Sequence, residues 1–182
     1  MNGRRRLALA LSVTAAIALL GAALASAALP EPNRALVVPF KSIGPVKFGT
    51  SKATVFQKWG QGMCAHEDTT GQDTCVWLAE RSNDLPPEGS GVQLKNGKVC
   101  GMMIQAGGNL RDGTLTITRL KNWKTEEGVG LGSRMRKAKA LLGGKTVKRK
   151  HGVTTAFISG TSESTRHKVA RIDIFKDGCR VT

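Results

Sequence analysis

Apolar and polar residues alternate along several short segments of the chain. The clearest cases are Leu115 with Ile117 and Ile172 with Ile174, each pair separated by one polar residue. Such alternation predicts antiparallel strands that bury one face. The predicted strands are Cys75–Ala79, Gly91–Lys95, Lys98–Gln105, Thr114–Leu120, Thr146–Lys150, Val153–Ser159, Lys168–Phe175 and Cys179–Val181. Between two of them, Asn96-Gly97 is typical of a tight hairpin turn, because both central positions of that turn need positive φ.

Two short segments follow the helical pattern instead. Val55 and Trp59 lie four residues apart, as do Ala138 and Leu142, so each pair shares one helix face. Each predicted helix has about nine residues, starts at a hydroxyl residue that caps it and stops at a glycine. These residues are Thr50 and Gly60 for the first helix, and Ser133 and Gly143 for the second. Helices this short are marginal alone, so we expect both to pack on the sheet.

The two helical segments belong to an internal similarity at an interval of 83 residues. Phe40–Gly60 aligns with Trp123–Gly143, and Lys95-Asn96-Gly97 has a counterpart in Lys176-Asp177-Gly178. The sequence therefore predicts an α+β fold in which two similar units, each a helix with an antiparallel sheet, form one disulfide-stapled domain. The predicted segments are a signal peptide (1–27), an N-terminal lead-in (28–39), a first α+β repeat (40–118) and a second, basic α+β repeat (119–182).

Four cysteines lie in the segment after the predicted signal peptide: Cys64, Cys75, Cys100 and Cys179. An even number of cysteines in an exported chain indicates a disulfide framework. Three connectivities are possible, and the internal similarity favours Cys64 with Cys75 and Cys100 with Cys179. The spacings contain no C-x-x-C and no histidine pair, so we expect no metal site and no cofactor.

The N-terminus predicts export. Arg4-Arg5-Arg6 precede an apolar run from Leu7 to about Ala25, and Ala25-Ser26-Ala27 forms a cleavage site of the A-x-A type. A weak twin-arginine match is present, but ordinary secretion fits better. Cleavage leaves a secreted or extracytoplasmic protein with no stable transmembrane span, whereas an uncleaved run would serve as an anchor. Oligomeric state is left open.

Charge is unevenly distributed. The chain has net charge +15, and residues 28–182 carry 25 basic and 13 acidic side chains, a net +12. Residues 28–113 hold 9 basic and 8 acidic side chains, whereas residues 114–182 hold 16 and 5. The predicted basic patch consists of Arg134, Arg136, Lys137, Lys139, Lys145, Lys148, Arg149 and Lys150. Such a patch binds phosphate-rich polymers or anionic headgroups, or it only keeps the protein soluble.

Candidate catalytic groups are few. His66, His151 and His167, with Lys150 or Arg166, could perform acid–base chemistry on phosphodiesters, as in secreted ribonucleases. None lies in a recognisable motif, and the chain lacks G-x-S-x-G. The sequence thus assigns no catalytic residue and favours a protein that is not an enzyme.

One resemblance rests on the helix starts. A β-rich lead-in, a Gly-Thr or Gly-Ser start and a glycine stop recur at Val46–Gly60 and Val129–Gly143. This pattern resembles the repeated unit of secreted β-lactamase-inhibitor-like proteins and of the SmpA/OmlA outer-membrane lipoproteins. The resemblance implies tandem units that form one sheet whose face binds a protein. The chain is also similar to small exported proteins of high-GC bacteria. The basic charge and the second disulfide depart from the pattern, and no functional residue is carried over.

These observations predict a secreted, non-catalytic binding or inhibitory module that engages a macromolecule of the cell envelope, either a protein or an anionic polymer. The first alternative is a secreted phosphodiesterase of the ribonuclease type. The second is a structural envelope protein held by charge. The sequence does not identify the partner.

Overall fold

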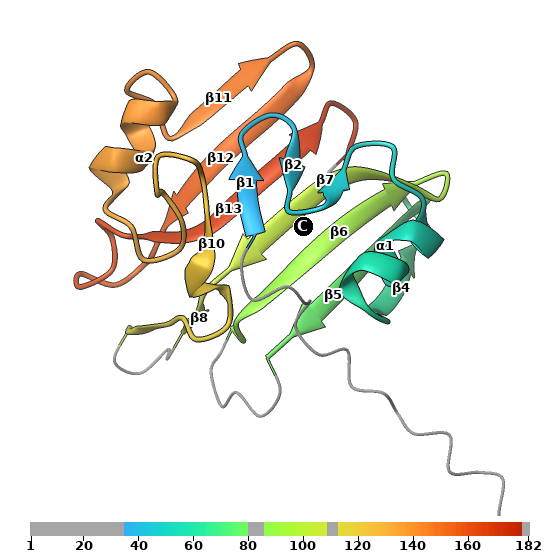
Figure 1. Ribbon diagram of the computed structural model, residues 1–182, viewed down its shortest axis with the longest axis horizontal. Helices are drawn as coiled ribbons and strands as arrows, with labels where there is room; N and C mark the ends of the chain where they lie inside the picture. The colour runs from blue at the N-terminus through green and yellow to red at the C-terminus, as the bar shows by residue number, and fades with distance from the viewer. Residues whose placement is uncertain (1–34, 80–85, 109–112, 180–182) are drawn as a thin grey trace, which may run out of the picture.

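The computed structural model describes residues 35–79, 86–108 and 113–179 (Figure 1). Its main element is a seven-stranded antiparallel sheet in the order β11-β12-β13-β7-β6-β5-β4. The strands are β4 (Met63–Glu67), β5 (Gln72–Leu78), β6 (Gly89–Lys95), β7 (Lys98–Gln105), β11 (Val147–Lys150), β12 (Val153–Ser159) and β13 (Val169–Lys176). β7 and β13 are neighbours, and their pairing joins the strands of both halves of the chain into one sheet.

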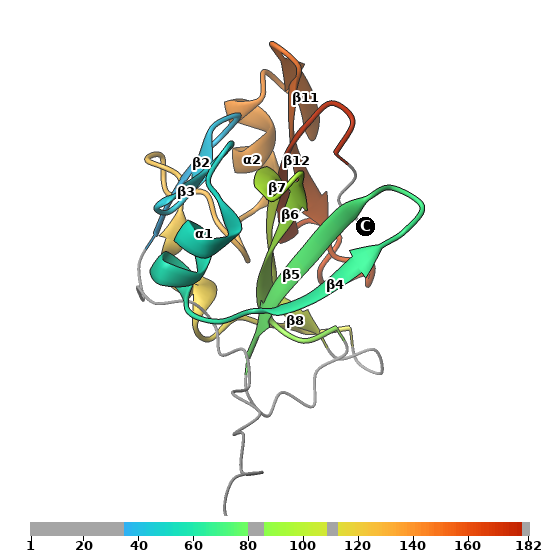
Figure 2. The ribbon, with the colours of Figure 1, turned by 90° about the vertical axis from the view of Figure 1, so that its right-hand side faces the viewer.

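A second layer lies against one face of this sheet. It contains a small sheet in the order β10-β1-β2-β3, in which β1 and β10 pair in parallel, and the helices α1 and α2. The bounds are β1 (Ala35–Val38), β2 (Ser42–Ile43), β3 (Val46–Lys47), β10 (Trp123–Lys124), α1 (Lys52–Trp59) and α2 (Met135–Leu141). Figure 2 shows this layer on one side of the main sheet, which we call the helix side. The opposite face is called the outer face.

Two smaller elements complete the described chain. β8 (Gly107–Gly108) and β9 (Leu115–Thr116) form a two-stranded pair, and a 3-10 helix covers Leu120–Asn122. The segment before this helix is held by the buried carboxylate of Glu88, which accepts hydrogen bonds from the backbone N–H groups of Thr118 and Leu120 at 3.0 and 2.7 Å. A buried carboxylate needs such donors, so Glu88 anchors this connection.

The core lies between the two layers, and three tryptophans form its centre. Trp59 of α1 packs edge-on against Trp77 of β5 and at a tilt against Trp123 of β10, with ring centroids 5.2 and 5.7 Å apart. All three are buried, and the Nε1 of Trp77 donates to the carbonyl of Gly60 at 3.1 Å. Large aromatic surfaces buried in this way stabilise the contact of α1 with the sheet.

Both helices start from the same backbone arrangement. Gly49 and Gly132, with φ of 81° and 76°, donate their N–H groups to the carbonyls of Val99 and Val169 at 2.9 and 2.8 Å. Glycine is favoured there because positive φ strains other residues. Each helix start is therefore tied to the first residues of a sheet strand, β7 or β13.

The predicted helix caps were wrong. The hydroxyls of Thr50 and Ser133 accept from the N–H groups of Lys47 and Gly130, three residues earlier, and so close the turn that precedes each helix. α1 is instead capped by Ser51, whose hydroxyl accepts from the N–H of Thr54. α2 begins after Arg134 without a side-chain cap.

The predicted α+β fold of two similar helix-plus-sheet units was also wrong. The protein is mainly β, with two helices of eight and seven residues in its described part. The strands predicted for two units share one continuous sheet, because β13 pairs with β7 instead of closing a sheet of its own. The boundaries at 28–39, 40–118 and 119–182 remain predictions, and the predicted signal peptide (1–27) lies outside the described residues.

Both predicted disulfides are present, Cys64–Cys75 and Cys100–Cys179. The reasoning for the second was incorrect, however. Asn96-Gly97 joins β6 to β7, whereas Lys176–Gly178 follows β13, so the two turns are not equivalent. Cys100 and Cys179 meet because β7 and β13 are antiparallel, which brings the start of one strand beside the end of the other.

The disulfide Cys100–Cys179 holds the end of the described chain against the outer face. The amide of Gln72 on β5 donates to the carbonyl of Gly178 at 3.1 Å, and Cys179 lies 3.3 Å from Gln93 Oε1 on β6. Residues 178–179 therefore cross from β13 over the neighbouring strands, and we call them the C-terminal strap. Among the described residues, no helix is long and apolar enough to span a membrane.

Candidate functional site

The outer face is defined by the register of the seven strands. Side chains alternate between the two faces of a strand, and Val92, Met102 and Ile174 point into the core on the helix side. Their sequence neighbours therefore point outward. One row of paired residues crosses the whole sheet on that face, in the order Met63, Val76, Gly91, Met103, Asp173, Ala156 and Val147.

This row is mostly apolar, and both of its ends are exposed. Met63 on β4 and Val147 on β11 are 48% and 51% exposed, and Ile158 on the same face of β12 is 41% exposed. Within the described part of the chain, one other large hydrophobic residue is as exposed, Leu36 of β1 in the small sheet. Exposed apolar side chains thus concentrate on the outer face, which is typical of a surface that docks another molecule.

Two pairs of opposite charges lie on the outer face. Arg171 Nε donates to Asp173 Oδ1 at 2.7 Å on β13, and Arg149 of β11 pairs with Asp177. Burial raises the pKa of Asp173, an effect that the hydrogen bond from Arg171 partly offsets. The centre of the face is therefore close to neutral although the protein is strongly basic.

A hollow lies on the outer face over β5, β6 and β7. It is a small depression lined by Thr74, Val76, Gly91, Gln93, Gly101 and Met103. Two glycines leave the backbone uncovered there, and a β-carbon added at Gly91 would lie 3.3 Å from the side chain of Met103. The C-terminal strap borders this region through Gln93. An inserted apolar side chain would find a preformed depression in a rigid sheet.

The predicted basic patch lies elsewhere, at the β11 edge and on α2. All eight residues of the patch are exposed, whereas Met135, Ala138 and Leu142 of the helix segment are buried. Figures 1 and 2 place α2 on the helix side at the β11–β12 end of the sheet. The outer face and most of the basic patch therefore point in different directions.

The three histidines do not meet. His66 lies on β4 and His151 follows β11, and these strands are the two edges of the sheet, about 29 Å apart at the usual strand spacing. His167 precedes β13, at the opposite end of the strands from His151. The proposed acid–base partners Lys150 and Arg166 are separated in the same way. Hence the structure does not bring these residues together into one catalytic site.

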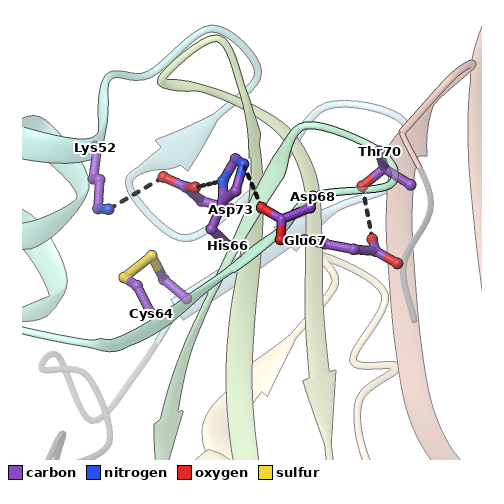
Figure 3. Close-up of polar contacts among 8 residues, drawn as sticks. Lys52, Cys64, His66, Glu67, Asp68, Thr70 and Asp73 are labelled. Atoms are coloured by element: carbon purple, nitrogen blue, oxygen red, sulfur yellow. Dashed lines mark hydrogen bonds and ion pairs between the residues drawn. A yellow bond between two sulfur atoms is a disulfide. The ribbon is translucent and has the colours of Figure 1, made fainter.

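His66 takes part in a local network at the β4–β5 hairpin instead (Figure 3). Its Nδ1 lies 2.7 Å from Asp73 Oδ1, and Lys52 Nζ donates to Asp73 Oδ2 at 3.2 Å. The hydrogen bonds from His66 and Lys52 hold the pKa of Asp73 below its usual value. In the described residues no cluster of three or more His, Cys, Asp or Glu side chains could hold a metal. The network joins α1 to the hairpin.

Sequence reasoning missed the role of Asp173. The alternation along β13 places Arg171 and Asp173 on the face opposite Ile172 and Ile174, which identifies the face but not its burial. Asp173 is 5% exposed because its side chain lies between those of Met103 on β7 and Ala156 on β12 and contacts Arg171. The opposite charges at positions i and i+2 were the available signal.

Comparisons with known proteins identify no family for this chain. No family model matches the chain, and no curated protein matches it. Among solved structures, an extracellular protein containing an SCP domain from Bacillus anthracis str. Ames is similar, with 10% identity and a TM-score of 0.40. The match covers 71% of this chain and 44% of that one. A likeness this distant carries no argument about fold or function.

Proposed function

We propose that the protein is an exported, non-catalytic binding module that docks a protein partner on the outer face of its seven-stranded sheet. The observation that carries the proposal is the apolar row from Met63 to Val147, which spans all seven strands and ends in exposed hydrophobic side chains. An inhibitory effect on the partner is one outcome of such docking.

The chemistry of this face favours a protein over a charged polymer. Its central charges, Arg171 and Asp173, are already paired with each other, so they offer little attraction to a polyanion. Protein interfaces have apolar centres depleted of unpaired charge, with a pocket that receives an anchoring side chain. The hollow over Gly91 and Gly101 supplies such a pocket.

The dimensions also support a protein partner. Seven strands span about 29 Å, and the longest strands run about 27 Å at the usual spacing and rise. That footprint, part of which the C-terminal strap covers, sets an upper limit close to the area of about 800 Å² that each partner contributes to a standard interface. A sheet pinned by two disulfides changes shape little on binding, and this lowers the entropic cost of association.

We place the protein outside the cytoplasm. Two disulfides join all four of its cysteines, and such bridges form and persist in oxidising compartments. The arginine-led apolar segment before Ala27 supports the same location. A phosphodiesterase that uses the three histidines is not favoured, because those residues lie at separate corners of the sheet.

The test compares charge insertions on two surfaces. Met63→Glu, Val147→Glu and Ile158→Glu, combined in one variant, place acidic groups on the outer face. Leu36→Glu is the matched control, because Leu36 and Val147 are equally exposed at 51%. Each protein serves as bait for the secretome and envelope of the producing cell, with a photo-crosslinking residue at Ala65, an exposed position on the outer face of β4.

We expect the wild type and Leu36→Glu to crosslink the same partner, and the outer-face variant to lose it. Thermal melts of all three proteins establish that the variants are folded. A partner that crosslinks equally to the outer-face variant would overturn the proposal, as would the absence of any partner for the folded wild type.

A further inference from the structure

The cations of α2 and β11 form one surface on the helix side, independent of the outer face. Lys148 and Lys150 pair with Thr155 and Val153 of β12. Thr155 is buried in the core and accepts a hydrogen bond from the N–H of Phe40, so side chains of this register point to the helix side. Val147 and Arg149 point to the outer face by the same alternation.

The strand cations lie close to the helix. The ammonium group of Lys148 is near the end of α2, since a β-carbon added at Gly143 would lie 3.6 Å from it. On α2, burial of Met135 and Ala138 leaves the cations on the solvent side of the helix. We call the combined set the polymer-binding surface: Arg136, Lys137 and Lys139 of α2, Lys145 of the connection, and Lys148 and Lys150 of β11.

This surface carries uncompensated charge. No acidic residue occurs from Gly128 to Ser162, a stretch that contains all eight cations of the basic patch. Some cations outside this surface have carboxylate partners, as Lys52 has Asp73 and Arg171 has Asp173. Within the described residues, none of the six cations of the polymer-binding surface forms an ion pair. Mutual repulsion of like charges costs stability unless a ligand neutralises it.

We infer that this surface binds a linear phosphodiester polymer along α2 and β11. Lys148 and Lys150 lie two residues apart on a strand, about 7 Å, a spacing at which two phosphates of an extended chain can be contacted separately. Lysine and arginine bind phosphate oxygens directly and release counterions. None of the described aromatic side chains is exposed, so the surface offers no platform for stacked bases and contacts backbone charge instead.

Protection of the sheet edge does not explain this arrangement. Lysines on an edge strand prevent pairing with another chain, and β11 is an edge strand. That role requires only the cations of β11. Arg136, Lys137 and Lys139 project from a helix, away from any strand edge, and therefore need a different explanation.

The experiment measures binding of fluorescent oligothymidylate of 20 nucleotides, and of poly(glycerol phosphate), between 50 and 200 mM salt. About five phosphate contacts give a log–log salt slope near −3.5 and an affinity loss of about 100-fold over this range. The test variant is Arg136→Ala/Lys137→Ala/Lys139→Ala. The control variant Lys41→Ala/Lys121→Ala/Lys124→Ala removes the same charge from exposed sites outside the surface.

We expect the test variant to reduce the salt slope by about 2, at 0.7 per lost contact, while the control leaves it nearly unchanged. The two polymers distinguish a nucleic acid from an envelope polymer as the source of the phosphodiester. Equal loss in both variants would assign binding to net charge and overturn the inference. Weak binding to both polymers with strong binding to phosphatidylglycerol vesicles would assign the surface to a membrane instead. Thermal melts show whether the variants are folded, and absence of binding by the folded wild type would also contradict the inference.

Discussion

The two edges of the main sheet are protected by different means. β4 is tied to its neighbour β5 by the disulfide Cys64–Cys75 and by His66, which is hydrogen-bonded to Asp73. β11 is tied to β12 by backbone pairing over four residues and carries three consecutive cations, Lys148 to Lys150. One edge is held by a covalent bond, whereas the other relies on charge.

The difference shows how an edge strand relates to function. An edge strand held covalently to its neighbour can carry a mixed set of side chains, as β4 does with all five residues exposed. An edge that repels other chains by charge presents those cations to solvent, where they can also meet a polyanion. We therefore expect perturbations of β4 to change stability and perturbations of β11 to change association.

The largest expected loss of stability comes from the disulfide Cys100–Cys179, which lies at neither edge of the sheet, and it is the reference for both edges. The variant Cys100→Ala/Cys179→Ala lacks the disulfide that joins β7 to the C-terminal strap. Its loss opens a covalent loop whose ends are 79 residues apart and frees the strap from the outer face. Loop entropy predicts a loss of about 4.5 kcal/mol in the free energy of unfolding. Urea denaturation measures it, and a loss below about 1 kcal/mol would contradict this role of the bridge.

Removal of the edge bridge should cost less. Cys64 and Cys75 are 11 residues apart, so Cys64→Ala/Cys75→Ala is expected to lose about 3 kcal/mol. Because β4 is an edge strand, hydrogen exchange should increase mainly in β4 and β5, while β12 and β13 keep their protection. A uniform increase over the whole sheet would show that the bridge stabilises more than this edge.

Neutralising the other edge should change association instead of stability. Lys148→Thr/Arg149→Thr/Lys150→Thr leaves β11 with strand-forming residues and no repulsion, so we expect concentration-dependent self-association in light scattering. Arg136→Gln/Lys137→Gln/Lys139→Gln on α2 is the matched control and should remain monodisperse to the same extent as the wild type. If both variants self-associate equally, the lower net charge alone causes the association.

The smallest effect concerns pH and separates two aspartates. The pKa of Asp73 is lowered in the folded protein, so its stabilising contribution is present above the unfolded value near 3.9 and is lost as pH falls through the folded value. The stability advantage of the wild type over Asp73→Asn, under about 1 kcal/mol for this partly exposed group, should therefore shrink on acidification.

For Asp173 we expect stability to change with pH in the opposite direction. Burial raises its pKa, so the folded state binds the proton more tightly than the unfolded state does, and protonation stabilises the fold. Relative to Asp173→Asn, the wild type should gain stability as pH falls through the folded pKa. Chemical denaturation between pH 3 and 7 compares both variants, and the same sign for both would contradict the assigned causes.

Much of the local structure was predictable. The bounds of β7 and β12 agree with the predicted strands, because hairpin turns and β-branched residues are local signals. β4 was missed, since Met63–Glu67 is exposed throughout and has no apolar alternation. The segment predicted as one strand over Thr114–Leu120 became the short strand β9 and a 3-10 helix, where Glu88 from another part of the chain binds the backbone.

The candidate surfaces were predictable to different degrees. The basic patch could be found from the sequence because its members are contiguous in two short segments. The outer face could not, because its central row takes one residue from each of seven strands, from Met63 to Val147 and Asp173. Only the strand order brings these residues together.

By itself, the sequence determined the strands β7, β12 and β13, the two helical segments, the four paired cysteines and the concentration of charge after residue 113. These depend on neighbours within a few residues or on composition. The tertiary structure decided that β13 pairs with β7, and with it the single sheet, the crossing of the C-terminal strap and the apolar outer face. Such pairings are set by the burial of side chains distant in the sequence, and a local pattern fits several of them equally well.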